Sequence, residues 1–189
     1  MRGTATHALD LLSALRLFDE LEVPFLDKSL EIDISSYLQR ELLLVKRKPE
    51  LARLGYAYVV IDLPATSPLL KLISFFISDV VIVPLTPTKF ARNGLDSIAR
   101  DVNLVTEQTG HPIAIRVLLC QVDERTLGTK RMRQHLHEEE LTTFQFQTEI
   151  PLNIEVEYAH QNEQSVLTFA PKSLGAAAYF TLTEEVMQL

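Results

Sequence analysis

The spacing of hydrophobic positions along the chain changes near residue 56. Before that point, apolar residues recur every three or four positions over 5–21 and again over about 35–48, which is the spacing of one helix face. Pro49 follows the second stretch, and proline stops a helix because it has no amide hydrogen to donate. The pattern therefore predicts a helical lead-in over about 1–55.

From residue 56 onward, short apolar runs alternate with longer amphipathic stretches. The predicted strands are 57–62, 79–84, 113–119 and a more alternating one at 144–150. The predicted helices are 67–78, 89–110, 129–141 and 172–187. Continuous apolar strands separated by helices indicate parallel strands that are covered on both faces. We expect a single α/β domain over 1–189, a doubly wound and mainly parallel sheet with helices on both faces, in which 56–189 carries the strand and helix alternation.

Composition and charge narrow the class of protein. With 47% hydrophobic and 23% charged residues and a net charge of −7, the chain has the composition of a soluble protein without a general affinity for nucleic acid or anionic membrane. The most apolar stretch, 69–85, contains Lys71, Asp79 and Pro84, whereas a membrane span needs about 20 apolar residues with few or no charges. The N-terminus also lacks the apolar core of a secretion signal. We expect a cytoplasmic protein.

The sequence does not indicate a metal site or a redox-active cysteine pair. Cys120 is the single cysteine, so one chain can form neither an internal disulfide nor the paired cysteine ligands of an iron–sulfur cluster. His135 and His137 are two positions apart on an expected helix, and residues at that spacing point to different sides. We interpret both histidines as solvent-facing.

Polar residues follow the ends of three predicted strands. Asp62, Thr86 and Gln121 each come directly or almost directly after an apolar run. In open α/β sheets, ligands bind outside the carboxyl ends of the strands. Asp62 has the position of a Walker-B-type carboxylate, which holds a water of a Mg²⁺ shell behind nucleotide phosphates. The alternative for Asp62 is an acidic residue that starts a turn.

Several segments, taken in chain order, resemble the ParA/Soj family of partition ATPases, within the deviant-Walker group that also contains MinD. The segments that carry the resemblance are YAYVVIDLPATSP, DVVIVPLTPTKFARNGL, VLLCQVDERT, EIPLNIEVEYA and FAPKSLGAAAYFTLTEEV. They run from about residue 56 to 187, and GTATHAL near the start resembles the residues after the family's switch I aspartate. The resemblance implies a P-loop NTPase-like fold, with ATP and Mg²⁺ as cofactors.

The resemblance also assigns roles to individual residues. It implies that Asp62 is the Walker B residue and that Pro64 and Ala65 belong to switch II, where the family usually has a second proline in place of Ala65. On the nucleobase side it places Gln121, Asp123, Arg125, Pro151 and Asn153. The alternatives are a solvated turn for the first three residues, and a strand-ending proline with an asparagine helix cap for the last two.

One basic cluster, Lys130, Arg131 and Arg133, is a candidate for contact with DNA, because ParA relatives coat the nucleoid through exposed lysine and arginine. The alternative is a solvated helix face that the glutamates at 138–140 balance. The C-terminal TLTEEVMQL has no lysine or arginine, so it differs from the basic amphipathic membrane helix that ends MinD relatives. A membrane-positioning role therefore ranks below DNA partition.

The 189 residues contain no Walker A motif, either as G-x-x-x-x-G-K followed by Ser or Thr or in the family's lysine-led form. Two hypotheses follow. The chain is a ParA-type plasmid or chromosome partition ATPase represented without its N-terminal P-loop portion; its family partners would be itself or an intact ParA-like chain, a ParB-like protein and DNA. Alternatively, it is a truncated descendant, a non-catalytic binding or dimerisation module. An intact P-loop encoded upstream of Met1 favours the first hypothesis.

Overall fold

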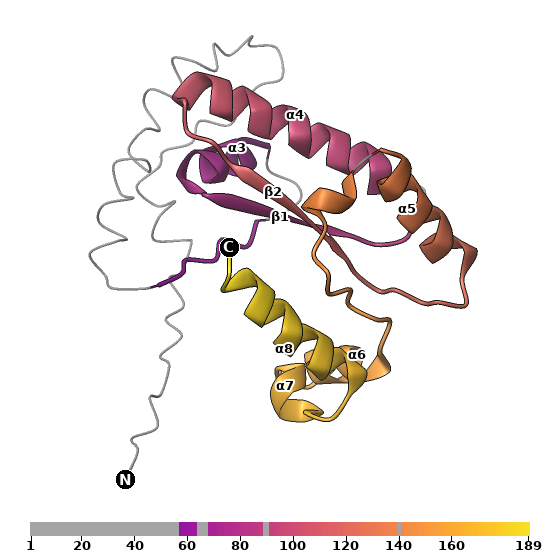
Figure 1. The fold of residues 1–189 in the computed structure, drawn as a ribbon. Helices are drawn as coiled ribbons and strands as arrows, with labels where there is room; N and C mark the ends of the chain where they lie inside the picture. The colour runs from indigo at the N-terminus through magenta and orange to yellow at the C-terminus, as the bar shows by residue number, and fades with distance from the viewer. Residues whose placement is uncertain (1–56, 64–67, 89–90, 140) are drawn as a thin grey trace, which may run out of the picture. The chain divides into compact units, whose positions relative to one another are not determined.

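The computed structural model describes residues 57–63, 68–88, 91–139 and 141–189 (Figure 1). The helical lead-in expected over 1–55, the switch II pair Pro64 and Ala65, and the GTATHAL segment lie outside the described residues. The prediction of one domain over 1–189 therefore stays a prediction. The described elements are α3 (Pro68–Ile77), β1 (Val80–Leu85), α4 (Ala91–Thr109), β2 (Ala114–Leu119), α5 (Leu127–Glu138), the 3₁₀ helix η1 (Leu141–Phe144), α6 (Ile154–Gln161), α7 (Val166–Phe169) and α8 (Leu174–Val186).

The sheet is built from two parallel strands joined by a helix. β1 and β2 lie side by side (Figure 1), with Val80 opposite Ala114 and Leu85 opposite Leu119. Parallel neighbours require a crossover connection because the chain must return to the same end of the sheet, and α4 provides it. This βαβ arrangement confirms the predicted α/β class.

Helices cover both faces of β2. Val117 and Leu119 are buried in a cluster with Met132 and Leu136 of α5 and with Leu95 of α4. The opposite face carries Leu118, which is buried with Phe146 and Ile150; the α8 side chains Ala178, Tyr179, Leu182 and Val186 pack against this second cluster. Alternate residues of the strand thus enter two cores, which explains why Val117, Leu118 and Leu119 are all apolar.

Further apolar contacts extend this core. α3 packs on α4 through the buried side chains Phe75, Val102 and Val105. α6, α7 and α8 share a small cluster of Ala159, Val166 and Ala176. Within the described ranges, none of the helices combines the length and apolar composition that crossing a bilayer requires.

The strand expected at 144–150 forms only in part. Phe146 donates its N–H to the Val117 carbonyl (2.9 Å) and Ile150 donates to the Leu119 carbonyl (2.8 Å), so this segment follows β2. Between these bonds, the amides of Gln147 and Thr148 donate to the Glu185 carboxylate of α8 at 2.9 and 2.8 Å. The ladder is interrupted at Thr148, because its amide donates to the Glu185 side chain and not to β2.

The strand expected at 57–62 does not form, and this prediction was wrong. These residues have no regular secondary structure, and the side chain of Val60 is 90% exposed. Within the described residues, no segment pairs with their backbone, and β1 has a paired edge only on its β2 side. An apolar run becomes a strand only where a neighbour satisfies its N–H and C=O groups, so the run alone is insufficient here.

Candidate functional site

The loops that follow β1 and β2 begin at the same edge of the sheet. Cys120 donates its N–H to the Leu85 carbonyl at 2.8 Å, so Thr86 and Gln121 start from neighbouring strand ends. The first turn of α5 lies against the loop after β1, because a Cβ at Gly128 would come within 2.8 Å of the Pro87 carbonyl oxygen. Glycine is required at this close approach. Two of the three predicted strand-end groups are therefore brought together.

A second pair of loops meets beside Val122. Its N–H donates to the Ile150 carbonyl at 3.0 Å, and its carbonyl accepts from Leu152 N–H at 2.9 Å. The nucleobase-side candidates Gln121 and Asp123 flank Val122 in sequence, while Pro151 and Asn153 flank Leu152. The structure thus places the two groups of candidates on opposite sides of one pair of backbone hydrogen bonds.

Gln121 has a left-handed backbone, with φ of 55°. Residues with a side chain rarely adopt this conformation, and where they do the surrounding structure holds them there. Here Cys120 is fixed to β1 and Val122 to the 150–152 segment, so the chain turns sharply between two fixed residues. The turn directs the polar loop 121–126 away from the strand.

Asp123 and Arg125 form a two-pronged ion pair within this loop. Arg125 donates from Nε to Oδ1 (2.9 Å) and from Nη2 to Oδ2 (2.8 Å), and its backbone N–H also reaches Oδ1 at 2.9 Å. The Asp123 side chain is 16% exposed, whereas that of Arg125 is 87% exposed. Asp123 therefore holds the arginine in place, and the guanidinium faces solvent.

The ion pair lowers the pKa of Asp123 from its ordinary value of 3.8 to about 2, chiefly through the side-chain hydrogen bond from Arg125. A lowered folded-state pKa contributes stability that is present above the unfolded value and is lost as pH falls toward about 2. We expect carboxyl NMR titration to give Asp123 a midpoint near 2 in the wild-type protein and a clearly higher one in Arg125→Gln. An unchanged midpoint in the variant would refute this account, and Arg131→Gln serves as the matched control.

Threonine hydroxyls anchor the end of the same loop. Thr126 caps α5 by accepting from Thr129 N–H, and the Thr129 hydroxyl accepts from Asp123 N–H at 3.3 Å. Thr129 is fully buried, a role that the sequence interpretation missed. The available signal was Thr-x-x-Thr directly before an amphipathic run, which is typical of a helix N-terminus.

Asn153 acts as the N-cap of α6. Its side-chain oxygen accepts from Glu155 N–H at 3.1 Å, which matches the helix-cap alternative considered for this residue. The same oxygen lies close to α8, because a Cβ at Gly175 would come within 3.2 Å of it. Contact between Asn153 and a nucleobase stays a prediction.

Asp62 is exposed and directly follows the irregular segment 57–61. No hydrogen bond or ion pair within the described ranges connects its side chain to the loops after β1 and β2. The role of Asp62 at Mg²⁺ therefore stays a prediction. Within the same ranges, no group of three histidine, cysteine, aspartate or glutamate side chains is arranged to hold a metal ion.

The basic cluster of α5 divides into two kinds of residue. Arg133 donates to Glu124 (Nη1 to Oε2, 2.8 Å) and to Glu149 (Nε to Oε1, 3.0 Å), and these bonds raise the pKa of its guanidinium further above the ordinary value. Arg133 thus links α5 to the loops on either side of it. Lys130 and Arg131 are exposed and are the better placed candidates for DNA.

The residues at this edge suit only one end of a nucleotide. A planar guanidinium and amide groups at Arg125, Gln121 and Asn153 can donate to, or stack on, a heteroaromatic base. Binding of the phosphates requires a glycine-rich loop with its lysine, and the 189 residues contain no such motif. The residues at this edge therefore have the chemistry to contact a nucleobase, whereas contact with the phosphates would need a motif that these 189 residues do not contain.

Comparison with known proteins gives consistent matches. Residues 25–115 match a family model described as an AAA domain. The sporulation initiation inhibitor protein Soj of Bacillus subtilis is 31% identical over 161 residues, which cover 82% of this chain and 61% of Soj. The chromosome partitioning protein ParA of Caulobacter vibrioides is 29% identical over 137 residues, covering 70% of this chain and 49% of that protein. The chain thus spans about half to three fifths of the length of these relatives.

Proposed function

Because the chain belongs to the ParA/Soj family of partition ATPases, we propose that it acts in ATP-dependent DNA partition and supplies the nucleobase side of the nucleotide site. The observation that supports this proposal is the meeting of loops 121–126 and 150–153 through the backbone bonds of Val122. The residues assigned to the base are Gln121, Asp123, Arg125, Pro151 and Asn153.

In this proposal, each residue has a stated task. Asp123 orients the guanidinium of Arg125, which stacks on the base or donates to its ring atoms. The left-handed turn at Gln121 presents its amide at the strand end, and Pro151 and Asn153 form the opposite wall. ATP with Mg²⁺ supplies the energy of phosphoryl transfer when bound, and Asp62 is the residue of this chain that would face the Mg²⁺ shell.

The family resemblance extends the proposal to partners. We infer ATP-dependent dimerisation with a second copy or with an intact ParA-like chain, stimulation by a ParB-like protein, and a cytoplasmic, nucleoid-associated location. Lys130 and Arg131 of α5 would contact DNA phosphates, because their side chains are exposed and that of Arg133 is bound to two glutamates.

A non-catalytic binding module is the second candidate. It is favoured by the lack of a phosphate-binding motif in the 189 residues. In that case the α/β fold would serve contacts with another protein, and no ligand would occupy the strand-end loops.

A measurement of nucleotide binding distinguishes the two candidate functions. If the chain provides only the base side, isothermal titration calorimetry should find that adenosine and ATP bind the 189-residue protein with similar weak affinity. Guanosine should bind more weakly, since the site would read the base. Arg125→Gln should reduce adenosine binding, while Arg131→Gln, which changes an exposed arginine of α5, should not. Absence of adenosine binding would leave the non-catalytic module as the better account.

A further inference from the structure

Arg133 of α5 binds two carboxylates at once. Its Nη1 donates to Oε2 of Glu124 at 2.8 Å and its Nε donates to Oε1 of Glu149 at 3.0 Å. Its Nη2 donates to the other oxygen of each carboxylate. Both pairs are therefore two-pronged, a geometry that fixes the orientation of the two partners as well as their distance. The guanidinium holds each glutamate in a defined place.

The two glutamates belong to the two loops that meet at the candidate base site. Glu124 lies in the loop after β2, and Glu149 directly precedes the 150–153 loop. The backbone bonds of Val122 join these loops at one place, and Arg133 joins them at a second place through side chains. Two separate connections restrict both the distance between the loops and their relative rotation, which one connection alone would leave free.

The exposure of the three side chains indicates a role in positioning more than in stability. The exposed fraction is 38% for Arg133, 68% for Glu124 and 19% for Glu149, and ion pairs in contact with water contribute little to the free energy of unfolding. The side-chain hydrogen bond from Arg133 lowers the pKa of Glu124 below its ordinary value of 4.5. Glu124 is therefore charged at neutral pH and keeps its bond to the guanidinium.

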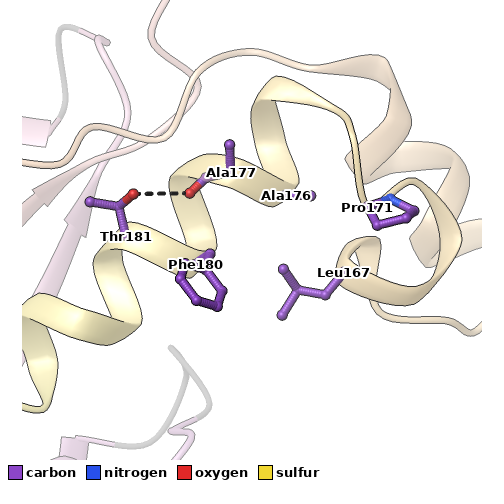
Figure 2. A pocket seen from close by; sticks show the side chains of 6 residues that line it. All are labelled: Leu167, Pro171, Ala176, Ala177, Phe180 and Thr181. Carbon is purple, nitrogen blue, oxygen red and sulfur yellow. Dashed lines mark hydrogen bonds between the residues drawn. The ribbon is translucent and has the colours of Figure 1, made fainter.

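The pocket between α7 and α8 is an alternative place for an aromatic base. Figure 2 shows it lined by Leu167, Pro171, Ala176, Ala177, Phe180 and Thr181. The Thr181 hydroxyl donates to the Ala177 carbonyl of its own helix at 3.2 Å, and the described residues that line the pocket include no charged side chain. A ligand site needs a few converging polar groups to orient its ligand, so the loops joined by Arg133 suit a base better.

We propose, on the basis of the function proposed above, that Arg133 is a positioning residue of the nucleobase site. It sets the distance between loops 121–126 and 149–153 and does not itself touch the base. Arg125 on one loop and Asn153 on the other are thereby held apart at a fixed separation before the base arrives. Walls that are already ordered lose less conformational entropy when a ligand binds, so the link through Arg133 should raise affinity for the base.

The binding test compares Arg133→Lys with the wild-type 189-residue protein, with adenosine as the probe. Lysine keeps the positive charge, but its ammonium cannot form two-pronged bonds to two carboxylates. Isothermal titration calorimetry should show an affinity for adenosine that is lower by about two- to tenfold, the cost of ordering one further group on binding. The urea midpoint of unfolding should stay close to that of the wild type.

Two control variants locate the effect. Arg100→Lys makes the same change at an exposed residue of α4 and should leave adenosine affinity unchanged. Phe180→Ser alters the α7–α8 pocket at a side chain that is 59% exposed, and it should also leave the affinity unchanged. Adenosine binding that is lost in Phe180→Ser and retained in Arg133→Lys would place the base in that pocket and overturn the proposal.

Hydrogen exchange tests the position of the loops without any ligand. The amides of Val122 and Leu152 form the backbone bonds between the loops, so both should exchange faster with deuterium in Arg133→Lys. The amides of α4 should keep their wild-type rates, because a local opening leaves distant elements protected. A general loss of stability would instead accelerate both sets of amides, and this outcome would contradict a positioning role.

The two measurements separate failure of this proposal from failure of the proposed function. If the wild-type protein binds adenosine while Arg133→Lys changes neither the affinity nor the exchange of the Val122 amide, Arg133 has no positioning role and the proposed function stands. If the wild-type protein binds no adenosine, the proposed function is wrong and the assignment of Arg133 to a base site is wrong with it. The exchange rates then still decide whether Arg133 fixes the two loops.

Discussion

Purified protein of these 189 residues is expected to release no measurable phosphate from ATP, with or without DNA, and Asp62→Ala should leave this result unchanged. Phosphoryl transfer depends on positioning and on charge stabilisation, and a single arginine acting on the phosphates is worth about 10³-fold or more. The sequence lacks the glycine-rich loop and its lysines, so the 189 residues cannot hold the phosphates in the way that phosphoryl transfer requires. The measurement is phosphate release by highly purified chain.

A fusion provides the complementary experiment. A family P-loop segment placed ahead of Arg2 should restore nucleotide binding and turnover, and Asp62→Ala should then abolish the turnover. Glu184→Ala in the same fusion is a suitable control, since Glu184 is an exposed residue of α8. If the unfused chain shows robust hydrolysis that Asp62→Ala removes, another group has replaced the P-loop and our account of the site is wrong.

Leu136→Ala should lower the free energy of unfolding by about 2–5 kcal/mol, the usual range for truncating a buried leucine. Leu136 is 0% exposed and packs in the cluster that joins α5 to Val117 and Leu119 of β2. Neighbouring groups can fill the resulting cavity only in part, because β2 is held from both sides. Urea unfolding followed by circular dichroism measures the change.

Leu127→Ala is the matched control for the loss of stability expected from Leu136→Ala. It removes the same atoms from the same helix, but Leu127 is 66% exposed, so the free energy of unfolding should change by no more than about 0.5 kcal/mol. Equal effects of the two substitutions would contradict the placement of Leu136 in the core.

The sequence predicted the type of an element correctly where the hydrophobic pattern was clear and a neighbouring segment was present to pair with it or pack against it. The helices expected over 89–110 and 172–187 correspond to α4 and α8, and the apolar runs at 79–84 and 113–119 to β1 and β2. The failure at 57–62 has a specific cause. Composition reports the preference for burial, but strand formation also depends on a neighbouring backbone, which no local pattern reveals.

The sequence predicted which loops form the candidate site, but it did not predict the side-chain contacts within those loops. Thr86 and Gln121 were expected to lie close together, because they follow parallel strands and the carboxyl ends of parallel strands meet at one edge of the sheet. The ion pair between Asp123 and Arg125 and the capping role of Asn153 depend on backbone angles in short loops. Glu185 is a further example, since its bonds to Gln147 and Thr148 span 38 and 37 positions in sequence, far beyond what residue spacing can show.

The central position of β2 has a consequence for how the described part of the protein loosens in its native state. β2 is paired with β1 on one edge, and on the other edge its Val117 and Leu119 carbonyls accept from the amides of Phe146 and Ile150. The amides in these bonds can exchange with solvent deuterium only after one neighbour has separated. Residues 58–63 have no such protection from described neighbours, and their amides should exchange early. Among the described residues, a protease would accordingly cut first within 58–63, leaving β1, α4, β2 and α5 as the slowest part to open.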